Sequence, residues 1–258
     1  MVRPLRKSAL RAVIAADYLG GLGLGGLLAL GYGLQTAGLA RTTVSSTGFI
    51  TGLCVVLTPI TAYLLFRDHI PGAAWIGVGL STLGLAMLFG IEAGSTAGDV
   101  LVLGGALAYA VQIVLLERFA PDYDPVAFTL VEMLAACIGF TAIALVRGDL
   151  SVPHGWTVWG ALLVTGVFAS AFAFLVQTWA QRRLSATRTA LVFAAEPVFA
   201  GFFGFALADD RLGAAGWAGC ALILGGIVVS EPAAASALAR RVREQGSRRR
   251  PLQAGRRG

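Results

Sequence analysis

Charged side chains are scarce in this chain of 258 residues. They make up 13% of it, whereas hydrophobic residues make up 57%, and the mean hydropathy is +0.76. A soluble domain carries about 25% charged residues. So few charges cannot cover a surface that faces water on every side, so the composition excludes an ordinary soluble protein and favours one that lies in a membrane.

Cysteine and histidine are scarce too, with three of the former and two of the latter. Cys54, Cys137 and Cys220 all fall in apolar stretches, and we interpret them as packing residues. His69 and His154 fall in expected loops without metal-ligand spacing. The sequence contains no P-loop, Gly-x-Ser-x-Gly or HExxH motif. We therefore expect no metal, no cofactor and no enzymatic activity.

The chain instead contains long apolar stretches. A bilayer core of about 30 Å is crossed by about 20 mostly apolar helical residues. Eight stretches of this kind run approximately over 12–36, 46–66, 72–90, 99–116, 125–146, 156–180, 189–208 and 213–230. The expected fold class is therefore all-α integral membrane, with eight transmembrane helices.

Lysine and arginine are distributed unevenly along the chain. If the N-terminus is cytoplasmic and the helices alternate, 17 of the 20 Lys and Arg residues lie inside and only Arg41, Arg147 and Arg211 lie outside. This bias predicts that both termini are cytoplasmic. We expect the arginine-rich tail, residues 232–258, to be disordered and to lie on anionic lipid, with no nucleic acid as partner.

The chain also repeats itself at a fixed spacing of 142 residues, the difference between positions 35 and 177. The phrases around Gln35 and Gln177 are LQTAGLARTTVSS and VQTWAQRRLSATR, and the same spacing aligns Trp75 with Trp217. Such self-similarity indicates duplication. The copies are offset by five helices, an odd number, so they are expected to cross the membrane in opposite directions, as repeats of secondary transporters do. A duplication that only enlarges the bundle is the alternative.

Three phrases carry a family resemblance: LQTAGLARTTVSSTGFITGLCVVLTPITAYLLFRD, VQTWAQRRLSATRTALVFAAEPVFAGFFGFALADDRL and GALAYAVQIVLLERFAPDYDPVAFTLVEML. They resemble EamA-type members of the drug/metabolite transporter superfamily, most specifically at AxEPVF and DDRL. The resemblance covers residues from about 10 to 230 and implies ten helices in two inverted five-helix repeats. It also implies transport of small metabolites without ATP hydrolysis.

The chain departs from that family in having eight apolar stretches rather than ten. Its basic start, MVRPLRKSALR, is similar to the loop that follows the family's second helix. We therefore expect an inverted-repeat bundle of the five-plus-five type that lacks the first two helices. A partial first repeat would span 1–94 and a second repeat 95–231. We also expect Met1 to be either a misplaced start or a genuine truncation.

The function expected from this resemblance is secondary transport of small organic metabolites or drugs, as a permease or efflux protein. The expected location is a bacterial inner (plasma) membrane, with several passes. Expected partners are a small-molecule substrate and membrane lipid, and a homodimer is one candidate assembly. A membrane enzyme is a weaker hypothesis because no nucleophile, base or metal cluster falls at membrane depth. A truncated or non-transporting partner subunit is the other alternative.

Acids inside apolar stretches are the strongest site candidates, because burying one at mid-membrane costs about 2.5 kcal/mol or more. Glu196 is the first choice, either to bind a cationic amine or to carry a coupling proton, since burial disfavours the charged form. A protonated structural acid is the alternative. Glu132 is the second candidate. Pro59 and Pro197 are expected to kink or break their helices.

Uncharged polar residues add to this candidate site. Tyr109, Gln112 and Glu117 recur at helical spacing, on or near one face of their helix. Gln35 and Gln177 occupy equivalent positions in the two copies and are candidate gate or helix-end residues. The aromatic residues that we consider for a lining are Tyr63, Phe193 and Trp179.

Overall fold

The computed structural model describes all residues except 1–6, 91–94, 149–151, 153, 208–212 and 232–258, and it leaves the side chains of 7–18 and 204–207 undescribed. The basic tail at 232–258 and Arg211 therefore lie outside the described residues. The rest of the chain is helical and contains no strand in these ranges.

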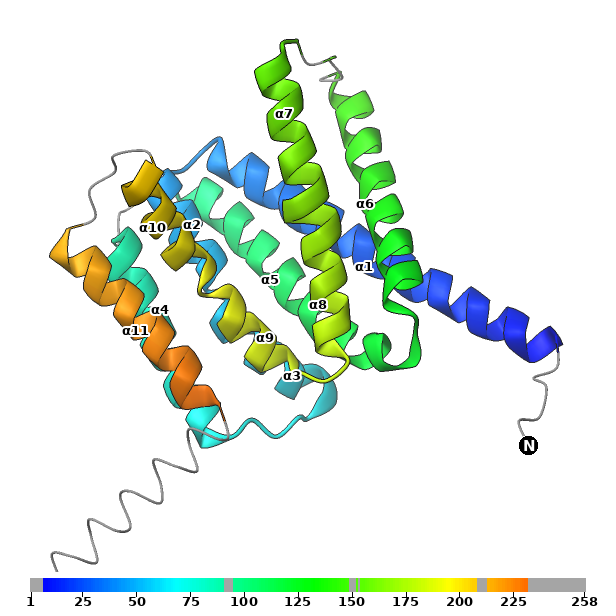
Figure 1. Ribbon diagram of the computed structural model, residues 1–258, viewed down its shortest axis with the longest axis horizontal. Coiled ribbons are helices and arrows are strands. Elements are labelled where there is room, and N and C mark those ends of the chain that lie inside the picture. Colours follow the sequence, from blue (N-terminus) through cyan, green and yellow to red (C-terminus); the bar gives the residue numbers. More distant parts are fainter. Residues whose placement is uncertain (1–6, 91–94, 149–151, 153, 208–212, 232–258) are drawn as a thin grey trace, which may run out of the picture.

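The helices follow one another with short connections (Figure 1). Their bounds are α1 (Lys7–Leu39), α2 (Val44–Gly52), α3 (Cys54–Phe66), α4 (Gly72–Phe89), α5 (Thr96–Phe119), η1 (Ala120–Asp122), α6 (Pro125–Arg147), α7 (Trp156–Val164), η2 (Thr165–Phe172), α8 (Ala173–Gln181), α9 (Ala186–Phe193), α10 (Glu196–Leu207) and α11 (Ala214–Ser230). Six segments of the described chain are long and apolar enough to cross a membrane. One of them combines α2 with α3, and another runs from α7 through η2 to the end of α8. Two residues separate α9, of 8 residues, from α10, of 12 residues, whereas one residue separates α2 from α3, and α11 has 17 residues. Six rather than eight segments therefore meet this criterion.

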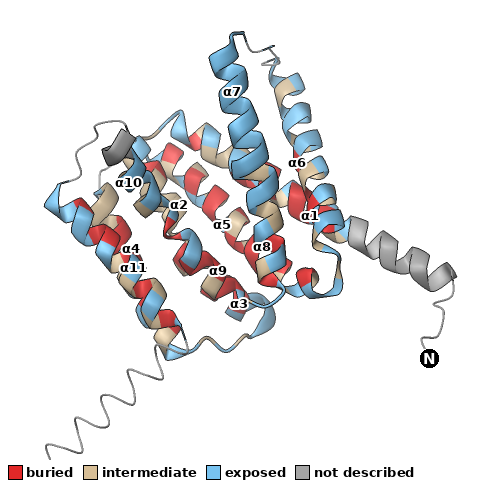
Figure 2. Cartoon of the chain, viewed as in Figure 1, coloured by how far each residue is buried: buried red, intermediate tan, exposed pale blue. Residues whose placement is uncertain are grey.

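Helix α5 lies in the middle of the bundle, where it packs against α1, α2, α3 and α9. Its central position explains why half of its span is buried, more than in any other of the six segments. By contrast, α7 and η2 stand at the edge beside α6 and contain no buried residue (Figure 2). Apolar side chains on such a surface suit contact with lipid.

Helices α4 and α11 pack against each other through glycine. A Cβ atom on Gly77 would lie 2.6 Å from the carbonyl oxygen of Gly226, and one on Gly84 would lie 2.6 Å from that of Gly219. Small residues allow helix backbones to come this close in lipid. The lower-numbered glycine of α4 meets the higher-numbered glycine of α11, so the two helices run antiparallel.

Helices in the two sequence copies begin and end at equivalent positions. Helices α1 and α8 end at Leu39 and Gln181, and helices α4 and α11 begin at Gly72 and Ala214. Each pair has the spacing of 142 residues that separates positions 35 and 177. The two copies therefore share local structure as well as residues.

The middle segment of each copy is interrupted at an equivalent place. The N–H of Leu53 donates to the carbonyl of Ile50 at 3.1 Å, and the N–H of Ala195 donates to the carbonyl of Val192 at 3.0 Å. Both bonds span three residues rather than the four of an α-helix, which tightens the turn. One helix ends and another begins at each of these turns.

The two prolines do not act alike. Pro59 lies inside α3 and is buried, so it does not itself break the helix; the interruption is at Leu53, before it. A proline within a helix removes the hydrogen bond to the carbonyl four residues earlier, and α3 continues despite that loss. Pro197 is the second residue of α10, directly after the other interruption, where a helical N–H has no partner to lose.

Candidate functional site

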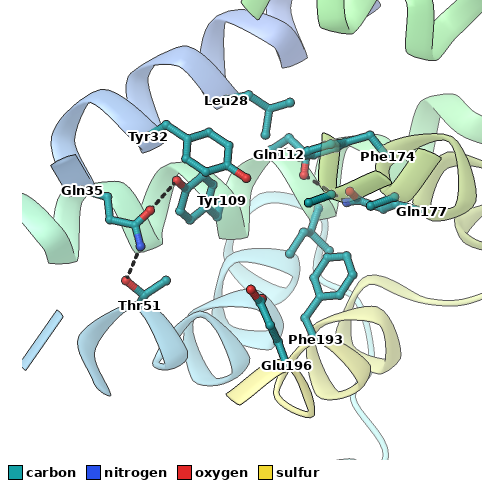
Figure 3. A pocket seen from close by; sticks show the side chains of 13 residues that line it. Leu28, Tyr32, Gln35, Thr51, Tyr109, Gln112, Phe174, Gln177, Phe193 and Glu196 are labelled. Atoms are coloured by element: carbon teal, nitrogen blue, oxygen red, sulfur yellow. Dashed lines mark hydrogen bonds between the residues drawn. The ribbon is translucent and has the colours of Figure 1, made fainter. Parts of the chain in front are cut away.

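A cavity of about 430 Å³ lies in the middle of the bundle, between α1, α2, α5, η2, α8 and the α9–α10 interruption (Figure 3). Its lining residues are Leu28, Tyr32, Gln35, Thr51, Tyr109, Gln112, Ile113, Ala169, Ala173, Phe174, Gln177, Phe193 and Glu196. Ligand cavities of this size, mostly apolar with a few polar groups, bind small molecules.

Corresponding residues of the two sequence copies face each other across this cavity. Three lining pairs share the spacing of 142 residues that separates positions 35 and 177: Tyr32 with Phe174, Gln35 with Gln177, and Thr51 with Phe193. The cavity therefore lies between the copies, with α5 forming a further wall.

One wall holds an amide in a fixed orientation. The hydroxyl of Tyr109 donates to Gln35 Oε1 at 2.9 Å, and Gln35 Nε2 donates to Thr51 Oγ1 at 3.0 Å (Figure 3). The ring of Tyr32 meets that of Tyr109 edge to face, with centroids 5.2 Å apart. These contacts place a polar side chain from α1 between partners from α2 and α5.

The opposite wall carries a chain of amides. Gln177 Nε2 donates to Gln112 Oε1 at 3.2 Å and to Gln181 Oε1 at 3.0 Å. Gln181 Nε2 in turn donates to the carbonyl oxygen of Ile113 at 2.8 Å. All three glutamines are buried, so their hydrogen bonds form in an environment where an unpaired amide would be costly.

Glu196 supplies the single charge among the described residues that line the cavity. It is the first residue of α10, and Figure 3 shows its carboxylate directed into the cavity. Within the described part of the chain, no cation forms an ion pair with it. The site can therefore attract a positively charged ligand.

The structure brings five of the six candidate residues to this cavity: Glu196, Tyr109, Gln112, Gln35 and Gln177. Gln35 and Gln177 lie in its wall and also near helix ends, four residues before α1 ends at Leu39 and α8 ends at Gln181. Glu132 is buried behind the wall, where its Oε1 accepts a hydrogen bond from Gln112 Nε2 at 2.8 Å.

Glu117, unlike Tyr109 and Gln112 on the same helix, does not line this cavity. Its Oε2 accepts a hydrogen bond from the N–H of Ala186 at 2.8 Å. It also lines a second cavity of about 570 Å³, to which Gln181 and the arginines Arg182 and Arg183 contribute. This second cavity lies at the end of the bundle where α8 ends and α9 begins.

Two of the three aromatic candidates are absent from the lining. Phe193 lines the cavity, whereas Tyr63 and Trp179 are 50% and 54% exposed. The guanidinium groups of Arg67 and Arg183 lie 5.4 and 5.7 Å from the centres of those two rings. Aromatic rings paired with arginine in this way suit the headgroup region.

Sequence reasoning missed Tyr32, Thr51 and Phe174. Tyr32 precedes Gln35 by one helical turn and so shares its face. Phe174 is its equivalent in the second copy. Extending the duplication from the glutamines to their neighbours on the same helix face would have identified both rings.

Comparison with known proteins decides the family. The model of the EamA-like transporter family matches residues 5–90 and 96–230, most of the chain. The chain belongs to the EamA-like transporter family. It is a membrane transporter with several helical crossings, and transport is the activity of the family rather than enzymatic catalysis.

Individual relatives are described as transporters as well. This EamA-like chain is 30% identical to an uncharacterized transporter of Archaeoglobus fulgidus over 216 residues, covering 83% of this chain and 68% of the relative. It is 26% identical to the uncharacterized transporter YyaM of Bacillus subtilis, covering 79% of this chain and 67% of that protein. A solved crystal structure matches with a TM-score of 0.72 at 20% identity, covering 84% of this chain and 76% of the other, which supports the fold alone.

Proposed function

We propose that this protein is a secondary transporter of small organic cations that works by alternating access between its two sequence copies. The observation that carries the proposal is the central cavity, which corresponding residues of both copies line and into which one carboxylate is directed. The alternative of a non-transporting subunit is not favoured, because the relatives are named transporters.

The chemistry of the lining supports a cationic substrate. Glu196 supplies a negative charge, and the rings of Tyr32, Tyr109 and Phe174 supply faces that attract cations. The amides of Gln112 and Gln177 add uncharged polar contacts. An organic amine with an apolar body would satisfy both the carboxylate and the rings, whereas an anion would be repelled by Glu196.

Packing between the copies supports alternating access. The antiparallel contact of α4 with α11 is reciprocal, because Gly77 meets Gly226 while Gly84 meets Gly219, and Gly219 and Gly226 are the equivalents of Gly77 and Gly84. Such a contact is expected for copies related by a two-fold axis in the membrane plane. Copies related in this way can exchange conformations and so open the cavity to either side.

We further propose a bacterial inner membrane location with both termini cytoplasmic. The charge distribution supports it, because Arg182, Arg183 and Arg188 gather around the second cavity at one end of the bundle. The positive-inside rule assigns that end to the cytoplasm.

Binding of three small molecules with a common ring tests the substrate class. Tyramine, tyrosol and 4-hydroxyphenylacetate carry a positive, no and a negative charge on the same phenol. A ligand that binds the folded state raises the midpoint of thermal unfolding. We expect tyramine alone to raise the midpoint of the purified protein in detergent, and a shift with the anion instead would contradict the proposal.

Glu196→Gln tests the residue. We expect the affinity for tyramine to fall by about 10- to 100-fold, because a charge-assisted contact contributes about 1.5–3 kcal/mol. Glu231→Gln makes the same change at an exposed acid beyond α11 and should leave affinity unaltered. Exchange of labelled tyramine across proteoliposomes that contain the wild-type protein, and its absence from empty vesicles, then tests transport itself.

A further inference from the structure

Glu132 is a buried acid that does not line the cavity. Its side chain is 0% exposed, on a face of α6 that packs closely against α1, where its backbone oxygen contacts Gly25. Glu132 Oε1 accepts the hydrogen bond from Gln112, but Glu132 Oε2 has no hydrogen-bond partner. A buried polar atom without a partner is rare and costly, so it requires an explanation.

The hydrogen bond to Gln112 connects this acid to the cavity. Gln112 lines the cavity, its Oε1 accepts from Gln177, and Gln177 donates onward to Gln181, which lines the second cavity. When the NH₂ group of an amide donates to a carboxyl oxygen, the carbonyl oxygen of the same amide points the other way and can accept from another donor. At Gln112 the carbonyl therefore faces Gln177, whose Nε2 donates to both Gln112 Oε1 and Gln181 Oε1.

No cation compensates Glu132 within the described part of the chain. Helices α1 and α8 pack against α6, and α5 reaches it through Gln112. The ionisable side chains that the structure describes on these four helices are Tyr32, Asp99, Tyr109, Glu117, Arg118, Cys137 and Arg147. Asp99, Tyr109, Glu117 and Arg118 bond to Thr42, Gln35, Ala186 and Asp68, respectively. Arg147 lies 15 positions beyond Glu132, about 22 Å along the helix.

We propose that Glu132 is the proton-binding carboxyl of this transporter, and that it loses its proton only when α6 separates from α1 and α5 enough to admit water. The inference rests on the proposed function. A neutral carboxyl still leaves Oε2 without a partner, but in the present packing it is much less costly than a carboxylate with one neutral donor and no cation. The proton therefore favours the packed conformation over an opened one, which couples protonation to the conformational change.

Proton transfer is balanced on both sides of the membrane. A hydronium ion on one side converts the Glu132 carboxylate to the neutral acid and becomes water, and water on the other side accepts the proton again. An ionised carboxylate binds an amide N–H more strongly than a neutral one, so ionisation of Glu132 alters how Gln112 and Gln177 present themselves to the cavity. The two acids thus have separate roles: Glu196 binds the organic cation and Glu132 binds the proton.

Infrared difference spectroscopy of the purified wild-type protein between high and low pH tests the assignment without any substrate. A protonated carboxyl group has a C=O stretching band that a carboxylate lacks. We expect Glu132→Gln to remove the band of a carboxyl shielded from water, and Glu196→Gln to leave it. A spectrum that keeps this band in Glu132→Gln would overturn the proposal.

Flux measurements in proteoliposomes test the coupling. The probe is labelled N,N,N-trimethyltyramine, whose fixed charge prevents it from crossing the bilayer as a free base. We expect Glu132→Gln to lower the ratio of accumulation driven by a pH gradient to exchange without a gradient by about tenfold or more. Unchanged accumulation in Glu132→Gln would also overturn the proposal.

A packing control separates loss of the proton from loss of a contact. Thr129 lies one turn before Glu132 on α6, and its hydroxyl donates to Thr178 of α8 at 3.0 Å. Thr129→Val removes this hydrogen bond and keeps the acid, so the infrared band and gradient-driven accumulation should persist. If wild type neither binds nor exchanges either amine, the proposed substrate fails, while the infrared result still decides whether Glu132 holds the proton.

Discussion

The interruption between α2 and α3 and the one between α9 and α10 share a backbone hydrogen bond that spans three residues, but their surroundings differ. Cys54 begins α3 and packs with the cluster of Ala62 and Ile113, and its Sγ lies 3.6 Å from Thr58 Oγ1. Glu196 begins α10, is exposed, and lines the cavity. The duplication therefore repeated the scaffold, whereas the charge of the site comes from one copy alone.

This difference shows how a symmetric frame carries an asymmetric site. Aromatic and amide positions occur in pairs across the cavity, but the acid has no counterpart and α5 adds Tyr109 and Gln112 from outside the pairs. A single carboxylate suits a ligand with a single positive charge. A second carboxylate at Cys54 would fall among apolar neighbours, where its burial would be unfavourable.

The largest effect should come from the α4–α11 contact, where the copies meet. We expect Gly84→Leu to abolish the folded protein, because a Cβ there lies 2.6 Å from the Gly219 carbonyl and 2.7 Å from Ile223 Cγ1. Gly79→Leu on the same helix has nothing within 4 Å and should remain folded. The fraction of each variant that is monodisperse in detergent measures how much folded protein remains. If Gly84→Leu folds while Gly219→Leu does not, the contact is not reciprocal.

Exchanging the residues that follow the two interruptions should have the next largest effect. We expect Cys54→Glu to lower stability by about 1–3 kcal/mol, because a carboxyl would lose its hydration beside the apolar side chains of Ala62 and Ile113. Glu196→Cys should change stability by about 0.5 kcal/mol or less, because that position is exposed. The midpoint of thermal unfolding reports both. Equal losses at the two positions would remove the contrast between the copies.

Helix caps should respond alike in the two copies. The hydroxyl of Thr43 accepts from the N–H of Ser46 at 3.0 Å, and that of Ser185 accepts from the N–H of Arg188 at 3.5 Å. We expect Thr43→Ala and Ser185→Ala each to cost about 1 kcal/mol of stability. Thr43→Ser keeps the hydroxyl and should retain wild-type stability. Thermal unfolding of the three variants checks this, and a loss confined to one copy would show that the caps are not equivalent.

The smallest effect should come from the ion pair between Asp68, which follows α3, and Arg118 of α5. Their side chains are 30% and 42% exposed. Surface ion pairs contribute about 0.2–1 kcal/mol and are screened by salt. Asp68→Asn should therefore lower the unfolding midpoint slightly at low salt and not at high salt. A large loss at both salt concentrations would mean that this pair holds the end of the first copy in place.

The apolar stretches and the spacing of the duplication predicted where most helices lie. Helix bounds follow hydrophobic runs and local caps, which are written in neighbouring residues. The same spacing put Gln35 and Gln177 at equivalent positions, and the structure has both in the cavity wall. The sequence did not predict the interruption at Leu53. Pro59 was expected to kink or break its helix, and α3 continues through it, because a proline in a helix indicates strain without saying which turn yields.

The sequence by itself therefore determined where most apolar helices lie, the repeat, and the presence of two acids within apolar stretches. Tertiary structure alone decided that Glu196 faces the cavity and that Glu132 lies behind its wall, bonded to Gln112. The side toward which a helical residue points depends on how its helix is rotated and what packs against it. In an almost uniformly apolar helix no pattern of polar residues records that rotation, so only the packing of α6 against α1 and the interruption before α10 could separate the two acids.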